Sequence, residues 1–561
     1  MKTKMNRNRK KQWMATGISL AIASGMLVQP VMAETAAEGN TETTLEKTAN
    51  ETENKKPRVI ITNDGEIDDK NSFIRLLYYA NDLNLVGLVQ SSSFAHWAGS
   101  PNGVGVKNMG ADGSEEFAWP GTEWMDEFID NYAEIYPNLV AHDSEYPTPE
   151  YLHSIVRIGN IGYMGEMDES TEGSNLIKDT ILDDSTEPLY ITAWGGMNTI
   201  GRAFMDIYQE YGETEEWDTV LQKIYDKVRI YTWYGQDGKD ENGEDPVLGG
   251  VLAKYFSKLT IVDVHSCQAL GWGWENATTN NGSEANSNHQ IPEVLTGAWM
   301  QENLEGDYGP LMEHYVTYGD GTYVEGNLDE FQMGSDDNLM TAGWFCGTGR
   351  ERYDFMGEGD TPTFLLLLDL GFNLGEDYGA GTLAGRFVKD EDLAKVGVTN
   401  YYVPENDTIV MSDWANVGQE TQAATYDSGA RWITDLMNDF AARADWGMTD
   451  DYASANHNPE IAVENGNEIT AAPGEKVSLT AVATDPDGDN VVLKWFNYPE
   501  AGTYGKEVVI DEGADSETMT FTVPEDAANG ATIHMLVKAT DDGNHTLSQY
   551  QRVVVTVAAE E

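Results

Sequence analysis

The sequence predicts an α/β domain with a mostly parallel sheet, followed by a smaller all-β domain. Between residues 57 and 446, apolar runs that suit buried strands alternate with stretches of helical periodicity. After residue 458 the pattern changes to short alternating runs separated by Gly, Pro and Asp turns. The chain has 561 residues, of which 40% are hydrophobic, and this is enough for more than one sizeable core.

The N-terminus has the features of a secretory signal over residues 1–33. Basic residues come first, an apolar run follows, and Val31-Met32-Ala33 provides a cleavage site. Residues 34–56 are rich in Glu, Thr, Asn and Ala without periodicity, which predicts a disordered acidic linker. We therefore expect a secreted protein, and we expect no membrane insertion because no later run is long and apolar enough.

The composition is strongly acidic, with 95 Asp and Glu against 34 Lys and Arg and a net charge of −61. Such a surface repels nucleic-acid backbones and anionic membranes, which argues against both as partners. It attracts divalent cations, although most of these acids serve solubility. The two cysteines, Cys267 and Cys346, are too few for a disulfide scaffold or a cysteine zinc site, and they form either one bridge or two buried thiols.

The first strand of the α/β domain, residues 59–62, runs into the acidic stretch Asn-Asp-Gly-Glu-Ile-Asp-Asp at residues 63–69. A helix is expected from about residue 72 to 80 and a second strand at 85–89, which completes a β-α-β unit. Ligands of open α/β sheets bind beyond the carboxyl ends of the strands, so the acidic stretch is expected at the binding edge. Its carboxylates either cap the helix or hold a hard cation such as Ca²⁺ or Mg²⁺.

The rest of the α/β domain, residues 57–446, repeats this alternation. Strands are expected at 189–193, 228–232 and 259–264, and the apolar run 364–368 follows a proline and is expected to start a helix. Residues 98–121 and 268–290 are long Gly- and Trp-rich insertions, which is typical of functional walls or lids.

The C-terminal part begins after a polar linker at residues 447–457. Residues 458–561 contain about seven short alternating strands, which predicts a β-sandwich of immunoglobulin type. Its acidic turns at 485–489 and 541–543 either hold structural Ca²⁺ or are ordinary hairpin turns.

Two distant segments are expected to join the acidic stretch. Residues 194–200, Trp-Gly-Gly-Met-Asn-Thr-Ile, follow the 189–193 strand, and residues 358–362 read Glu-Gly-Asp-Thr-Pro. With these motifs the sequence resembles the nucleoside hydrolase family, which has D-x-D-P-G-x-D-D, G-x-L-T-N-I and H-D-P turns in the same order. It is more similar still to a secreted branch labelled cellulose-binding, which has E-I-D-D, E-G-D-T-P and a C-terminal immunoglobulin-like domain.

The resemblance implies a nucleoside-hydrolase-like sheet flanked by helices, with a Ca²⁺ site at the strand ends. Asp64 would be both a ligand of the ion and the general base for the attacking water. Asp69 and Asp360 would be further ligands, Asn198 would give its backbone carbonyl, and Asp68 would hold a sugar hydroxyl. The implied activity is hydrolysis of an N- or O-glycosidic bond, here of a furanosyl sugar, with inversion at the anomeric carbon.

The sequence departs from the family's pattern in this region. Thr62 stands where the family has its first Asp, and Gly65-Glu66 replaces Pro-Gly. Gly359 stands where many members have a His that protonates a purine leaving group. The nucleobase mechanism therefore needs another proton donor, or the substrate is an O-glycoside.

Candidates for the proton donor are His96, Asp237 and Glu358, the first two of which follow expected strand ends. Glu358 is also a candidate substrate contact. Trp97 and Trp233 are the tryptophans expected to stack on a sugar, because an indole combines apolar area with a polar N–H. For each of these residues the alternative is a structural role in packing the loops.

Two functions therefore stay open on the sequence alone. The first is a secreted Ca²⁺-dependent glycosidase, and the alternative is a non-catalytic carbohydrate (cellulose)-binding protein on the same scaffold. The expected partner in either case is a sugar, a nucleoside or a glycan, and the resemblance also allows a homo-oligomer.

Overall fold

The computed structural model describes residues 56–93, 96–98, 121–233, 235–238, 245–264, 270, 292–321, 351–368, 370–371, 375–395, 397–405 and 429–558. The predicted signal, nearly all of the predicted acidic linker, both cysteines and nearly all of the two long insertions lie outside these residues. Trp97, Trp233 and every other candidate site residue lie within them.

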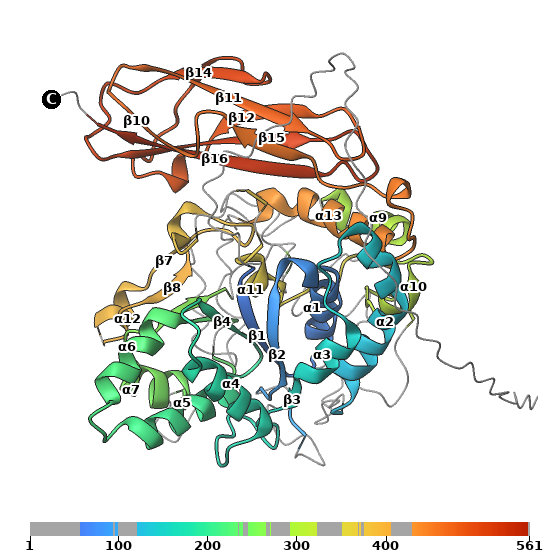
Figure 1. The fold of residues 1–561 in the computed structure, drawn as a ribbon, viewed down its shortest axis with the longest axis vertical. Coiled ribbons are helices and arrows are strands. Elements are labelled where there is room, and N and C mark those ends of the chain that lie inside the picture. Colours follow the sequence, from blue (N-terminus) through green and yellow to red (C-terminus); the bar gives the residue numbers. More distant parts are fainter. Residues whose placement is uncertain are drawn as a thin grey trace, which may run out of the picture. The chain divides into compact units, whose positions relative to one another are not determined.

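An eight-stranded sheet in the order β3-β2-β1-β4-β5-β6-β8-β7 forms the α/β domain, as predicted (Figure 1). All neighbouring strands are parallel except β7 and β8, which pair antiparallel at one edge. The strands are β1 (Arg58–Asn63), β2 (Asn84–Gln90), β3 (Val156–Ile158), β4 (Leu189–Trp194), β5 (Val228–Thr232), β6 (Thr260–Asp263), β7 (Phe387–Lys389) and β8 (Tyr401–Pro404).

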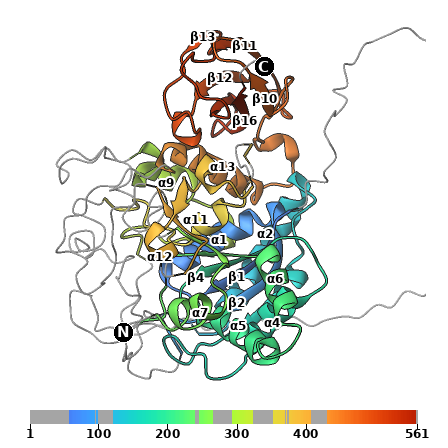
Figure 2. The same ribbon diagram turned by 90° about the vertical axis from the view of Figure 1, so that its left-hand side faces the viewer.

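Helices cover both faces of this sheet (Figure 2). Val59 and Ile61 of β1 pack into an apolar cluster with the first group of helices, whereas Ile60 packs into a second cluster on the other face. The first group is α1 (Ile67–Tyr78), α2 (Trp124–His142), α11 (Thr361–Leu365) and α13 (Ile433–Trp446). The second group is α4 (Glu172–Leu182), α5 (Asn198–Tyr211), α6 (Trp217–Lys227) and the π-helical turn η2 (Leu248–Leu252). β1 is therefore buried on both faces, as its apolar sequence predicts.

Shorter helical segments connect these elements. They are η1 (Ala80–Asp82), α3 (Pro149–Ile155), α7 (Ala253–Tyr255), η3 (Glu293–Leu295), α9 (Gly297–Asn303), α10 (Gly309–Met312), η5 (Tyr378–Ala380), α12 (Glu391–Lys395), η7 (Ala430–Trp432), η8 (Tyr452–Ser454) and η9 (Pro499–Ala501). Within the described part of the chain, none of the helices has the length and apolarity that crossing a bilayer requires.

Helix α1 begins at Ile67, five residues earlier than the sequence predicts. Asp68 and Asp69 are thus in its first turn, where the helix dipole favours negative charge, and Lys70 N donates to Glu66 O at 3.1 Å. The last three residues of the acidic stretch therefore belong to the helix, which fixes the directions of the Asp68 and Asp69 side chains. The run near residue 364 is helical as predicted, because Pro362 occupies the first turn of α11.

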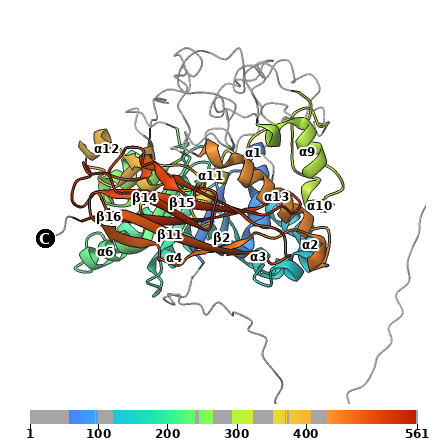
Figure 3. The same ribbon diagram turned by 90° about the horizontal axis from the view of Figure 1, so that it is seen from above.

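The C-terminal part is a β-sandwich of two four-stranded sheets, as predicted (Figure 3). The orders are β10-β16-β15-β12 and β13-β14-β11-β9, and Trp495, Leu479 and Val555 belong to the apolar core between them. The strands are β9 (Glu460–Val463), β10 (Glu468–Ala471), β11 (Lys476–Thr484), β12 (Val492–Asn497), β13 (Ile510–Glu512), β14 (Thr518–Thr522), β15 (Thr532–Thr540) and β16 (Ser548–Val557).

The sandwich is joined to the α/β domain through α13. Lys538 Nζ of β15 donates to both carboxylate oxygens of Asp435 at 2.7 and 2.8 Å, and Tyr550 OH also donates to Asp435. The next residue of α13, Leu436, accepts a hydrogen bond through its carbonyl from Arg75 of α1 at 3.4 Å. One helix therefore contacts both the sandwich and the helix that begins at the acidic stretch.

A chain of hydrogen bonds holds the segment between α13 and the sandwich. His142 contacts the Thr449 carbonyl through Nε2 at 2.8 Å and His457 Nε2 through Nδ1 at 3.0 Å. His457 Nδ1 contacts Asp487 at 3.0 Å, and its ring stacks on Tyr452. Both histidines are buried, so the junction is packed and polar.

Candidate functional site

The strand register brings three chain segments together at the carboxyl edge of the sheet. Asn63, the last residue of β1, pairs with Gln90 of β2 on one side and with Trp194 of β4 on the other. Asp64, Ser91 and Gly195 therefore leave the sheet side by side. The chain turns at Gly65, whose φ of +80° favours glycine.

The first turn of α1 brings a fourth segment to this edge. Gly359 N donates to Asp68 Oδ2 at 3.1 Å, so the loop before α11 lies against the start of α1. Asp360 follows directly, and one of its carboxylate oxygens lies within 4.8 Å of one of Asp69. Segments 291 residues apart thus contribute to one cluster of carboxylates.

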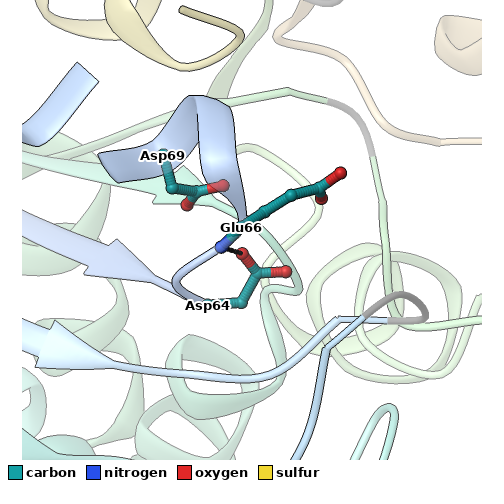
Figure 4. Close-up of side chains that lie close together, drawn as sticks. All are labelled: Asp64, Glu66 and Asp69. Carbon is teal, nitrogen blue, oxygen red and sulfur yellow. Dashed lines mark hydrogen bonds between the residues drawn. The ribbon is translucent and has the colours of Figure 1, made fainter. Parts of the chain in front are cut away.

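The resulting cluster has two overlapping groups of three residues whose ligand oxygens lie within 4.8 Å of one another. Figure 4 shows the carboxylates of one group around the turn from β1 to α1, with Glu66 N hydrogen-bonded to Asp64. Four members are at most 4% exposed and Glu66 is half-buried. The groups are Asp64, Glu66 and Asp69, and Asp68, Asp69 and Asp360.

Proximity and burial make the ionised form of these carboxylates costly. Burial, and then Asp64, raise the pKa of Asp68 to about 7, while His96 acts in the opposite direction. Burial, and then Asp360, raise the pKa of Asp69 well above its usual range, and burial and Asp68 do the same for the pKa of Asp360. A bound cation would relieve this cost.

The donor set fits a hard cation. Asp64 Oδ2, Asp68 Oδ1 and Asp69 Oδ1 are buried and have no hydrogen-bond partner among the described residues. All donors are oxygens, which Ca²⁺ and Mg²⁺ prefer. Glycine at position 195 provides the space that the Asp64 carboxylate occupies, because a Cβ there would lie 2.8 Å from Asp64 Cγ. Asp64, Asp69 and Asp360 would hold the ion, with Glu66 beside them.

Asn198 begins α5 next to this turn, and both polar atoms of its side chain are hydrogen-bonded inside the protein. Its Nδ2 donates to the carbonyls of Asn160 and Glu166 at 2.7 and 3.0 Å, and its Oδ1 accepts from Ser91 Oγ at 2.8 Å. The network fixes the start of α5. The predicted role of the Asn198 carbonyl as a ligand stays a prediction.

Asp237 lies beside the same turn and contacts the start of α5. Its Oδ2 accepts from Met197 N at 2.8 Å and the carboxylate also accepts from Asn198 N, so it caps α5. Asp64 lies against Gly195, and Asp237 lies against the next residue, Gly196, where a Cβ would be 2.6 Å from Asp237 Oδ1. The geometry favours a structural role for Asp237 over that of a proton donor.

Glu358 is also engaged in contacts inside the protein. It is fully buried and binds Arg75 Nε at 2.5 Å and Arg75 Nη2 at 2.9 Å, and it accepts from Tyr315 OH and from Thr361 Oγ1. Because both carboxylate oxygens are engaged inside the protein, this conformation does not offer Glu358 to a substrate.

The aromatic candidates are buried as well. Trp97 is 8% and Trp233 is 7% exposed, and Trp233 belongs to the apolar cluster that includes Trp194 and Phe364. Neither indole therefore presents an open face for a sugar in this conformation. His96 is the one proton-donor candidate that the structure brings within electrostatic reach of Asp68.

Sequence reasoning did not assign a role to Glu66 or to Arg75. The signal for Glu66 was its place between Asp64 and Asp69 in the acidic stretch. The signal for Arg75 was a charged residue among the apolar residues of an amphipathic helix, where it is fully buried.

Comparison with known proteins gives two family matches. Residues 58–387 match the nucleoside hydrolase-like domain of cellulose-binding Sde182, and residues 476–557 match the C-terminal domain of the cellulose-binding protein Sde0182. No curated protein is similar enough to count as a match.

Among solved structures, one similar protein is a nucleoside hydrolase-related protein from Saccharophagus degradans that is associated with carbohydrate metabolism. It is 25% identical with a TM-score of 0.61, and the match covers 90% of this chain and 100% of that one. A plant nucleoside hydrolase is 12% identical with a TM-score of 0.28, covering 70% of this chain and 99% of its own.

Proposed function

The chain belongs to the cellulose-binding Sde182 family, with its nucleoside hydrolase-like domain, and on this premise we propose that it is a secreted Ca²⁺-dependent hydrolase of glycosidic bonds, acting on a furanosyl sugar. The observation that carries the proposal is the set of unpartnered, buried carboxylate oxygens of Asp64, Asp68 and Asp69 at the binding edge of the sheet. Buried carboxylate oxygens without donors are uncommon in folded proteins, which supports a bound cation over helix capping alone.

Each step of the proposed reaction uses a residue of this cluster. When bound, Ca²⁺ would supply Lewis-acid chemistry to a water and to a sugar diol. Asp64 Oδ2 accepts a proton from the attacking water, and Asp68 Oδ1 accepts a hydrogen bond from a sugar hydroxyl. The water oxygen bonds to the anomeric carbon, and the bond to the leaving group breaks with its electron pair leaving on that group.

The leaving group needs a proton, and we assign that donor role to His96. The contacts made by Asp237 and Glu358 favour His96, because the first caps α5 and the second is paired with Arg75. His96 lies near Asp68, and histidine is the side chain that most often serves as a general acid. A proton held there can pass to a leaving oxygen or nitrogen.

The test is turnover of p-nitrophenyl ribofuranoside and arabinofuranosides by the full chain. We expect release of p-nitrophenol that stops with EDTA, returns with Ca²⁺ and is absent in Asp64→Ala. Glu127→Gln, at an exposed position on α2, is the matched control and should leave the rate unchanged. Turnover that persists in EDTA and in Asp64→Ala would overturn the proposal.

The donor assignment has its own test. His96→Gln should slow the hydrolysis of an alkyl furanoside or a nucleoside much more than that of the p-nitrophenyl furanoside, because p-nitrophenolate leaves without a proton. An equal loss on all three substrates would contradict donation by His96.

A second function is favoured by the description of the family as cellulose-binding and by the carbohydrate-metabolism context of the Saccharophagus degradans relative. In this proposal the chain binds a glycan and does not hydrolyse it. Binding to cellulose or soluble oligosaccharides that persists in Asp64→Ala, together with no turnover of any furanoside, would support it.

A further inference from the structure

A cleft of about 850 Å³ lies between the sandwich and the α/β domain, and none of the residues that line it belongs to the carboxylate cluster. Strands β10, β15 and β16 form its floor, and the loop around η9 and the segment 377–386 form its walls. Figure 1 shows β16 on the side of the sandwich that faces the α/β domain. Clefts of this size at domain junctions are common ligand sites.

Four threonines form a row across the floor of the cleft. Thr556 of β16 pairs with Thr470 of β10 on one side and with Thr532 of β15 on the other, so the three side chains lie on one face of the sheet. This is the outer face, because the alternate residue Val555 belongs to the core of the sandwich. Thr503, after η9, extends the row, with its Oγ1 3.2 Å from Thr532 Oγ1. Three of the four, Thr470, Thr503 and Thr556, are exposed, so the row is open to a ligand.

His534 is a buried polar group that lines the cleft from the next row of this face. It pairs with Val554 of β16 and is 3% exposed. Its Nδ1 accepts from Arg552 Nη1 at 3.0 Å, and burial lowers its pKa to about 4, so the ring is neutral and Nε2 carries the hydrogen. Cδ2, which is bonded to Nε2, lies on the open side of Gly502, where a Cβ would be 3.4 Å away. Among the described residues this N–H has no hydrogen-bond acceptor, which is uncommon for a buried donor.

The polar groups of the cleft distinguish between ligand classes. Asp377, Glu468 and Glu500 line it, and Arg386, which also lines it, is paired with Glu405. An anionic ligand would meet three carboxylates, and an ammonium or guanidinium group has no lone pair to accept the buried N–H. An apolar ligand would leave the hydroxyls and the N–H without partners. The hydroxyl groups of a neutral sugar both donate and accept, so a neutral sugar satisfies the carboxylates, the threonines and the N–H together.

We propose that this cleft is a carbohydrate-binding site for a neutral glycan chain, with the threonine row and His534 Nε2–H as its hydrogen-bonding groups. Because both ends of the row are exposed, a chain longer than the cleft can continue over the sandwich. The proposal goes beyond the proposed function, since it needs neither Ca²⁺ nor hydrolysis and uses no residue of the carboxylate cluster.

The test is calorimetric titration of the full-length chain in EDTA, which removes Ca²⁺ from the proposed hydrolytic site. The probes are neutral oligosaccharides of glucose, xylose, mannose or arabinose, with an oligogalacturonate as the anionic counterpart. We expect at least one neutral probe to bind. Its dissociation constant should rise about 10-fold or more in Thr470→Val/Thr556→Val, which removes two hydroxyls and keeps the branched shape of both side chains.

Two further variants complete the test. Thr556→Lys, whose long side chain would cover the row, should also lose binding, and it decides the question if circular dichroism shows that the double variant is unfolded. The matched control is Thr518→Val/Thr522→Val, at two exposed threonines of β14 in the other sheet, which should bind as the wild type.

Three results would overturn the proposal. They are no binding of any neutral probe in EDTA, tighter binding of the oligogalacturonate than of every neutral probe, and unchanged affinity in a folded variant of the threonine row. Hydrolysis is judged separately, because Asp64→Ala should leave this binding unchanged. If the wild type turns over no furanoside but binds a neutral probe through Thr556, the hydrolase proposal fails and the cleft proposal stands.

Discussion

Replacing Glu358 by alanine is expected to destabilise the α/β domain and to weaken Ca²⁺ binding. The change leaves Arg75 charged and fully buried, with Tyr315 OH and Thr361 Oγ1 deprived of their acceptor. An uncompensated buried charge costs about 3–5 kcal/mol, and each orphaned hydroxyl adds about 1 kcal/mol. The free energy of unfolding should therefore fall by about 5–7 kcal/mol.

The assay is guanidinium unfolding followed by tryptophan fluorescence in EDTA, so that Ca²⁺ does not contribute. The matched control is the double variant Arg75→Met/Glu358→Leu, which removes both charges and should recover most of the loss. A loss below about 1 kcal/mol in Glu358→Ala would refute the reasoning that this pair is a buried ionic contact.

Ca²⁺ binding provides the second measurement on Glu358→Ala. Glu358 precedes Gly359 and Asp360, which contact Asp68 and Asp69, so a loosened loop should weaken Ca²⁺ binding about 10-fold or more. An unchanged dissociation constant in a destabilised variant would show that the pair stabilises the fold without positioning the site.

Three further predictions concern other contacts. Gly195→Ala should weaken Ca²⁺ binding, because its Cβ would lie 2.8 Å from Asp64 Cγ; Gly250→Ala, whose Cβ would meet its nearest neighbour at 3.9 Å, should bind as the wild type in calorimetry. Burial and a neighbouring arginine lower the pKa of His534 to about 4. The contribution of the neutral imidazole to the free energy of unfolding is therefore complete above about pH 6.5 and is lost as the pH falls through 4, by up to about 3 kcal/mol. In His534→Gln this part of the pH dependence of unfolding should be absent, and an unchanged profile would contradict it. Asp435→Ala should make the junction with the sandwich more sensitive to limited proteolysis, and equal cleavage rates would rule out a role of that ion pair in docking.

The sequence predicted the fold because the fold depends on local signals, whereas the roles of the site residues stay predictions. An apolar strand, an acidic stretch and an amphipathic helix within about twenty residues define the β-α-β unit, and the parallel register then brings the strand ends together. Asp64, Asp68 and Asp69 lie in that stretch, and Asp360 was assigned through the family resemblance.

The contacts that sequence reasoning missed are between residues far apart in the chain. Glu358 is 283 residues from Arg75, and no local pattern reveals that the two form a buried pair. Asp237 caps a helix 40 residues earlier, a role that depends on how two loops meet. Trp233 follows a strand end as expected, but it is buried in an apolar cluster whose members come from many distant parts of the chain.

The contacts of His142 at the base of the sandwich determine which of its ring nitrogens carries a hydrogen. A carbonyl oxygen only accepts hydrogen bonds, so His142 Nε2 must carry the hydrogen that faces Thr449. Burial lowers the pKa of His142, which favours the neutral ring and leaves its Nδ1 without a hydrogen. That bare nitrogen lies 3.0 Å from His457 Nε2, and His457 Nδ1 lies 3.0 Å from the Asp487 carboxylate. The junction between the two domains is therefore fastened by one continuous chain of polar contacts, which runs from the Thr449 carbonyl through both imidazole rings to the Asp487 carboxylate.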